Sequence, residues 1–123
     1  MHFARWVFAI AGVYGLLILP PHYFFEEGIG RAHPPPITHP EFFYGFLGVA
    51  LAWQVAFLVI ALDPPRYRLM MLPAMIEKFS FAAAAIALFA IGRLYDGMLV
   101  AGLIDLMLGV LFVAAFWRCR ASG

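Results

Sequence analysis

The chain has 123 residues, of which 65% are hydrophobic and 12% charged, and its mean hydropathy is +0.92. Soluble domains carry roughly 25% charged residues, so this composition excludes an ordinary soluble domain and indicates an integral membrane protein. The net charge of +1 combines both signs, without the basic stretch that nucleic-acid binding requires. We therefore expect the lipid bilayer, and not nucleic acid, as the partner of this chain.

Four apolar stretches are long enough to cross the ~30 Å hydrocarbon core as helices of about 20 residues. They cover about 3–19, 42–62, 69–91 and 97–117. Paired prolines end the first two stretches, at Pro20-Pro21 and in DPPRYR, because proline lacks a backbone donor. The last two are joined by GRLYDG, which is so short that their helices must run antiparallel. The sequence thus predicts an all-α fold, a single domain formed by an integral membrane bundle of four transmembrane helices with short loops.

Residues 20–41 form the longest connection, predicted to lie outside the cytoplasm. Histidine and acidic residues gather in it, and by residue type they could ligate a metal: His22, Glu26, Glu27, His33 and His39. Their spacing follows neither the i, i+4 pattern of a helical site nor any fixed motif. We interpret this stretch as a solvated loop without a metal site. Glycine and alanine at four-residue intervals in 48–56 predict a close helix contact on that face.

The arginines predict the orientation in the membrane. One side of the bundle would carry five of them, Arg5, Arg66, Arg68, Arg118 and Arg120. The other side would carry Arg31 and Arg93 together with four acidic residues. The positive-inside rule places both termini in the cytoplasm.

Four polar residues lie within the predicted spans, which is unusual in hydrocarbon. At ~1.5 Å per residue, Gln54, Glu77, Lys78 and Asp105 lie roughly 12 to 21 Å below the outer helix ends, in one central band. A central Lys or Asp costs about 2.5–3.5 kcal/mol on insertion scales, so such residues face the bundle interior and find partners there. A proton passed from Lys78 to Glu77 would also lower this cost.

Neighbouring side chains leave a helix about 100° apart, so Glu77 and Lys78 are predicted to have different partners. The flexible lysine stem reaches toward Asp105, and Lys78–Asp105 is the predicted ion pair. Glu77 is then left to Gln54, Ser80, Tyr14 or a ligand. Together these six residues form the candidate ligand-binding or buried polar cluster.

Several functions are compatible with this cluster. It could be a structural device that fixes helix register, a site for a small hydrophobic ligand such as a quinone or lipid, part of a proton-coupled transporter, or a contact with a partner helix. An accessory subunit that docks other membrane helices, or a homo-oligomer, is the alternative to ligand binding. The sequence contains no HExxH, CxxC or phosphate loop and names no cofactor, so an enzyme is the third choice.

The segments HPEFFYGFLGVALAWQ and LPAMIEKFSF, with the size and the four spans, carry a family resemblance. The layout resembles small four-helix inner-membrane proteins of bacteria, and loosely the DoxX-like group. The resemblance implies the bacterial inner membrane as location and a role in membrane-associated redox or small-molecule handling. No catalytic motif of that group can be placed on these residues.

The orientation can be tested with reporter fusions at Ala32 and Ala121. Because the arginines are concentrated on one side, we expect the fusion at Ala121 to report the cytoplasm and the fusion at Ala32 the opposite side. Activity of a periplasmic and a cytoplasmic reporter at each site measures this directly. Two fusions that report the same side would contradict the four-span topology.

Overall fold

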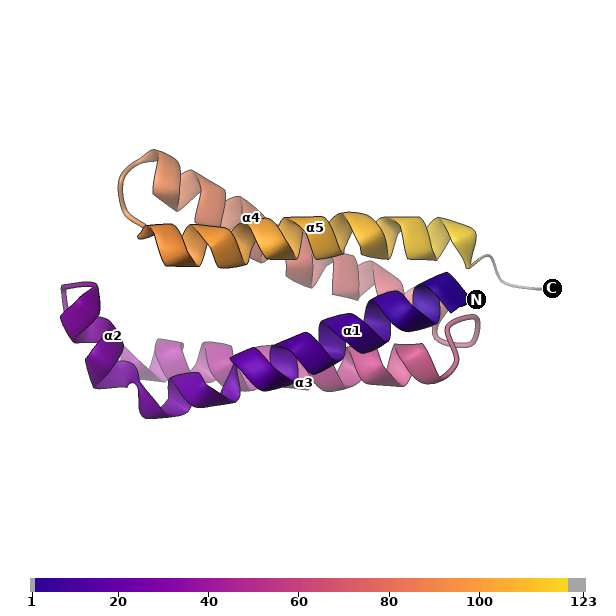
Figure 1. The fold of residues 1–123 in the computed structure, drawn as a ribbon, viewed down its shortest axis with the longest axis horizontal. Helices are drawn as coiled ribbons and strands as arrows, with labels where there is room; N and C mark the ends of the chain where they lie inside the picture. Colours follow the sequence, from indigo (N-terminus) through magenta and orange to yellow (C-terminus); the bar gives the residue numbers. More distant parts are fainter. Residues whose placement is uncertain (1, 120–123) are drawn as a thin grey trace.

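The computed structural model describes residues 2–119, in which every regular element is helical (Figure 1). This confirms the predicted all-α fold. The elements in chain order are α1 (His2–Ile18), η1 (Pro20–Phe24), α2 (Glu26–Ala32), α3 (Pro40–Leu62), η2 (Arg68–Met70), α4 (Met71–Ala90) and α5 (Asp96–Arg118).

Four helical segments are long and apolar enough to cross a membrane, as expected of a multi-pass membrane protein. They are His2–Phe24, Pro40–Leu62, Arg68–Ala90 and Asp96–Arg118. The helices α1, α3, α4 and α5 begin and end close to the predicted spans. The second predicted span, for example, begins at residue 42, and its helix begins two residues earlier, at Pro40. Proline suits this position because it fits the first helical turn.

The bundle consists of two antiparallel hairpins (Figure 1). The first hairpin is α1 packed along α3, and the second is α4 packed along α5. Glycine permits both close contacts: a Cβ on Gly12 of α1 would lie 2.8 Å from Leu58 of α3, and one on Gly102 of α5 would lie 2.5 Å from the Cβ of Ala85. Small residues therefore bring the helix backbones together within each hairpin.

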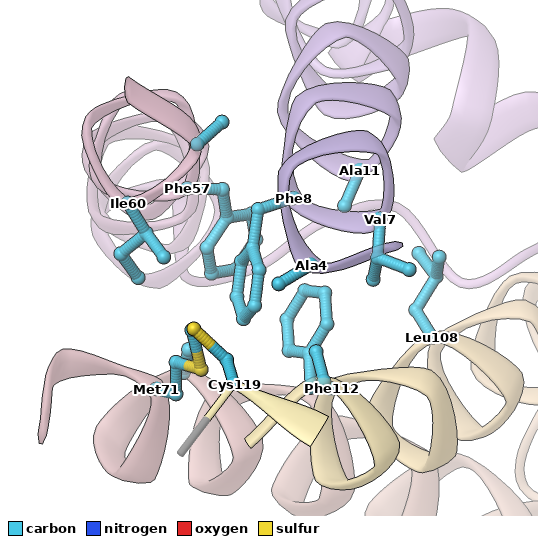
Figure 2. Close-up of a cluster of buried hydrophobic side chains, with 13 residues drawn as sticks. Ala4, Val7, Phe8, Ala11, Phe57, Ile60, Met71, Leu108, Phe112 and Cys119 are labelled. Carbon is cyan, nitrogen blue, oxygen red and sulfur yellow. The ribbon is translucent and has the colours of Figure 1, made fainter. Parts of the chain in front are cut away.

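The hairpins meet at the end of the bundle that carries both termini, here called the terminal end (Figure 1). Three buried phenylalanines fill this junction (Figure 2). The ring of Phe112 from α5 stacks on Phe8 from α1 at 4.2 Å and meets Phe57 from α3 edge-on at 5.0 Å, between ring centroids. Met71 from α4 joins the same cluster. All four long helices thus contribute to one apolar core.

Cys119 also belongs to this core, where it is buried and free. The sequence showed only an isolated thiol near the C-terminus. In the structure its small apolar side chain fills the junction beside Met71 (Figure 2), as free cysteines commonly do.

Two arginines complete the terminal end by capping helix C-termini. The Arg5 Nε donates to the Ala61 carbonyl oxygen at 3.2 Å, near the end of α3. The Arg68 Nε donates to the Phe116 carbonyl oxygen at 2.9 Å, near the end of α5, and its guanidinium lies 3.7 Å from the Phe116 ring centroid. A cation at a helix C-terminus satisfies free carbonyls and complements the helix dipole. Arg120, one of the five arginines that predict the orientation, lies outside the described residues.

The connection 20–41, at the opposite or α2 end, is more ordered than the predicted solvated loop. It forms η1 and the two-turn helix α2. The Tyr44 hydroxyl of α3 donates to Glu26 Oε1 at 2.9 Å, and the rings of Tyr23 and Tyr44 stack at 5.8 Å. These contacts with α3 were invisible in the sequence because they join residues 18 or more positions apart.

Replacing Phe112 tests whether the aromatic junction holds the hairpins together. Phe112→Ala removes a buried ring that contacts two other helices, so we expect a loss of about 3 kcal/mol in the free energy of unfolding. The control is Phe24→Ala, whose side chain is 84% exposed and should leave stability almost unchanged. Unfolding in mixed micelles measures both, and equal losses would contradict this role of the junction.

Candidate functional site

A large cavity lies between the two hairpins, on the α2 side of the aromatic junction. Its volume is about 1210 Å³, and residues of α1, α3, α4 and α5 form its wall. Most of that wall is apolar and includes Ile18, Leu47, Val49, Trp53, Ile76 and Met98. Because α3 and α4 touch at few points, the hairpins leave this space between them. The junction closes the bundle at one end, and the cavity occupies the other.

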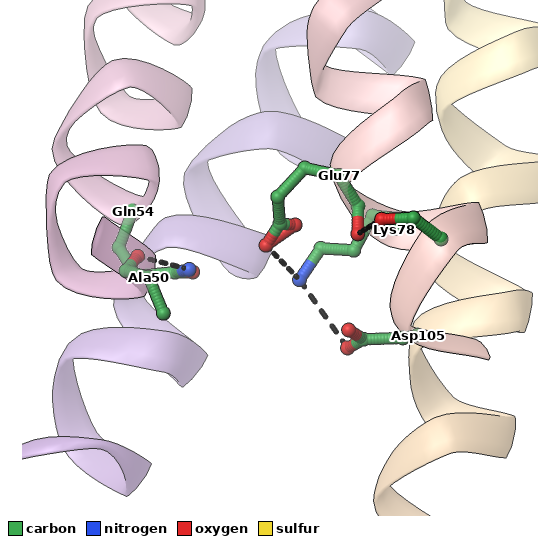
Figure 3. Close-up of polar contacts among 6 residues, drawn as sticks. Ala50, Gln54, Glu77, Lys78 and Asp105 are labelled. Atoms are coloured by element: carbon green, nitrogen blue, oxygen red, sulfur yellow. Dashed lines mark hydrogen bonds and ion pairs between the residues drawn. The ribbon is translucent and has the colours of Figure 1, made fainter. Parts of the chain in front are cut away.

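The floor of the cavity contains the charged residues singled out in the sequence (Figure 3). The Lys78 Nζ donates to Asp105 Oδ1 at 3.3 Å, so the predicted ion pair is present. The same ammonium lies 3.8 Å from Glu77 Oε1. The expectation that Glu77 and Lys78 have different partners is therefore wrong. Both side chains are long and flexible enough to curve to one point although they leave α4 in different directions.

Gln54 approaches the same space from the other hairpin (Figure 3). Its side chain is buried, and its Nε2 donates to the Ala50 carbonyl oxygen at 2.8 Å. Within residues 2–119, the buried oxygens Gln54 Oε1 and Glu77 Oε2 have no hydrogen-bond partner. Leaving a buried acceptor without a donor costs about 1–3 kcal/mol. Both residues line the cavity, Gln54 from α3 and Glu77 from α4.

The other two predicted members of the cluster, Tyr14 and Ser80, do not take part in the ion pairs. Tyr14 and Ser80 both line the cavity. The Ser80 hydroxyl donates to the backbone carbonyl oxygen of Glu77 at 3.2 Å. In the part of the chain described, neither hydroxyl bonds to the Glu77 carboxylate. The structure thus brings all six predicted residues to one cavity, but the ion pairs join only Glu77, Lys78 and Asp105.

Gly15 of α1 is a residue of this site that the sequence reasoning missed. The Gln54 amide occupies the space that a Cβ on Gly15 would fill. Only glycine lets this amide lie against α1. The available signal was the pair Gly12 and Gly15 in the first span, which are three residues apart and therefore share a helix face.

Two aromatic contacts join the hairpins on the α2 side of the junction, and the sequence reasoning found neither. The rings of His33, which ends α2, and Tyr95, which precedes α5, stack at 3.5 Å with an interplanar angle of 6°. Phe46 of α3 and Phe81 of α4 stack at 5.9 Å. Burial raises the pKa of Tyr95, so its ring stays an uncharged phenol at neutral pH. Tyr95, Phe46 and Phe81 are cavity residues, so these contacts border the cavity.

The histidines and acidic residues of 20–41 have other contacts. His22 Nδ1 lies 2.9 Å from the Ile18 carbonyl oxygen, and His39 Nδ1 lies 3.9 Å from Glu41 Oε2. Between residues 2 and 119, no three His, Cys, Asp or Glu side chains are grouped so that they could hold a metal ion.

Comparison with known proteins found no family model, no curated protein and no solved structure that matches this chain.

The coupling of Lys78 to Asp105 can be measured with a double-mutant cycle. Lys78→Met leaves two carboxylates without their cation, and we expect it to cost about 3–5 kcal/mol of stability. Asp105→Leu added to Lys78→Met should recover part of that loss, and Glu77→Gln added as a third change should recover more. Unfolding in mixed micelles gives each value, and strictly additive losses would exclude the ion pair.

Proposed function

We propose that this chain binds a small hydrophobic ligand, such as a quinone or a lipid, in the cavity between its hairpins. The polar head of the ligand would contact Glu77, Lys78 and Asp105, and its apolar part would lie along the wall formed by residues such as Trp53 and Ile76. Apolar cavities with a few converging polar groups are the usual form of small-molecule sites.

One observation carries this proposal: within residues 2–119, the two residues whose buried side-chain oxygens lack a hydrogen-bond partner, Glu77 and Gln54, both line the same large cavity. A cluster that served only to fix helix register would be expected to satisfy its own polar atoms. The volume of about 1210 Å³ leaves room for a ligand, since it exceeds the roughly 300–1,000 Å³ that small-molecule pockets commonly measure. A bound molecule would supply the missing hydrogen bonds after these two side chains turn toward it.

The proposed location is the bacterial inner membrane, with both termini in the cytoplasm. Its support is the distribution of arginines, because Arg5, Arg66, Arg68 and Arg118 belong to the terminal end while Arg31 and Arg93 belong to the α2 end. The cavity would then lie toward the outer side of the membrane. The DoxX-like resemblance stays a prediction.

A second function, as an accessory subunit or homo-oligomer, is favoured by one surface feature. The residues Gly48 and Ala52 of α3 were predicted to permit a close helix contact, and both are exposed in the structure. A Cβ on Gly48 would meet only the Tyr23 hydroxyl, at 3.7 Å. This small-residue face of α3 is thus free for a helix of another chain.

The ligand proposal is tested by purifying the wild type, Glu77→Gln and Gly45→Phe in parallel. Gly45 lines the cavity, and a Cβ there would meet no other atom within 4 Å, so phenylalanine adds bulk to the wall from a position with free space. We expect the wild type to retain a small molecule, detected by mass spectrometry, and both variants to lose most of it at nearly unchanged thermal stability.

Glu41→Gln is the matched control, because the Glu41 side chain is exposed and lies outside the cavity. It should retain the molecule at the wild-type level. A small molecule that stays bound to all four proteins, or is absent from all four, would contradict the ligand proposal and favour the accessory role.

A further inference from the structure

We infer that the head of the ligand donates hydrogen bonds and carries no negative charge, as a hydroxyl or ammonium group does. This inference rests on the proposed function and names the chemistry that the cavity floor selects.

The formal charge of the cavity is the first argument. Its lining contains two carboxylates, Glu77 and Asp105, and one ammonium, Lys78. Among the described residues of the lining, His22 is the only other titratable side chain besides tyrosines. With a neutral histidine, the formal charge is negative. An anionic head would have to lie beside two carboxylates in a region of low dielectric, where repulsion is strong.

The position of the ammonium is the second argument. The Lys78 side chain is only 4% exposed, compared with 18% for Glu77 and 15% for Asp105. The Lys78 Nζ lies 5.1 Å from the ring centroid of Phe57, which belongs to the core at the terminal end. A ligand in the cavity therefore meets carboxylate oxygens more readily than the ammonium.

The hydrogen-bonding groups of the floor are the third argument. Three of its donor groups already bond within the chain: Lys78 Nζ donates to Asp105, Gln54 Nε2 to the Ala50 carbonyl oxygen, and the Ser80 hydroxyl to a backbone carbonyl oxygen. Because the Ala50 carbonyl can only accept, the Gln54 amide must present its nitrogen to it, and Oε1 is the atom that remains without a partner. Among residues 2–119, the buried side-chain atoms left without a partner, Gln54 Oε1 and Glu77 Oε2, are acceptors. A ligand group that bonds to either of them must donate.

Four probes with one common tail separate the effect of a hydrogen-bond donor from that of head-group charge. They are 1-dodecanol, its methyl ether, dodecylammonium and dodecanoate. The ether lacks the donor of the alcohol, and dodecanoate reverses the charge of dodecylammonium. Trp53 lines the cavity and serves as a fluorescent reporter once Trp6 and Trp117, which are both largely exposed, are replaced by phenylalanine. The protein is measured in nanodiscs of uncharged lipid.

We expect saturable changes in Trp53 fluorescence with the alcohol and the ammonium, and apparent affinities at least about tenfold weaker for the ether and for dodecanoate. Glu77→Gln should weaken dodecylammonium more than dodecanol, because it removes a negative charge and keeps an acceptor oxygen. Gly45→Phe, which adds a ring to the cavity wall, should reduce the saturable response and so locate the binding.

The outcomes distinguish the two proposals. Equal affinities for all four probes would keep the ligand site and overturn the requirement for a donating head. Tighter binding of dodecanoate than of dodecanol would overturn it as well. A complete absence of saturable changes would overturn the proposed function and this inference together.

Discussion

The rest of the bundle depends on one constraint, namely that the Lys78 ammonium cannot face hydrocarbon. A lysine at the centre of a membrane helix costs about 2.5–3.5 kcal/mol even on the mildest scales. The structure meets this constraint by turning Lys78 inward, 3.3 Å from Asp105 and 3.8 Å from Glu77. Because Asp105 belongs to α5, the same pair fixes how α4 and α5 are rotated against each other.

The two ends of the bundle differ in packing: the terminal end is filled, and the α2 end contains the cavity. At the terminal end, rings from Phe8, Phe57 and Phe112 fill the space between the hairpins. On the α2 side of the charged residues, the hairpins border a cavity whose wall includes exposed side chains such as Val49 and Ile76. Lys78 lies near the boundary, since its ammonium is close to both the Phe57 ring and the two carboxylates. The aromatic junction at the terminal end thus packs directly against the charged residues that line the cavity.

An incompletely satisfied floor is an argument for function because polar groups in a low-dielectric interior are costly when unpaired. The ion pairs account for Lys78, yet they leave one oxygen of Glu77 and one of Gln54 without a donor. Glycine at position 15 gives the Gln54 amide its place against α1. A large, mostly apolar cavity with a few polar residues in its lining is the usual form of a small-molecule site.

The sequence by itself determined the four long helices, which follow from composition, a local property of the chain. It also predicted the pairing of Lys78 with Asp105, because the two residues lie at similar distances from the ends of neighbouring helices. Only the tertiary structure decided that Glu77 shares the same ammonium, that Gln54 lies against Gly15, that His33 stacks on Tyr95 and that Cys119 is buried in the core. Each of these contacts depends on side-chain rotamers or on the packing of segments distant in sequence. Neither rotamers nor long-range packing can be predicted from the periodicity or hydropathy of the sequence.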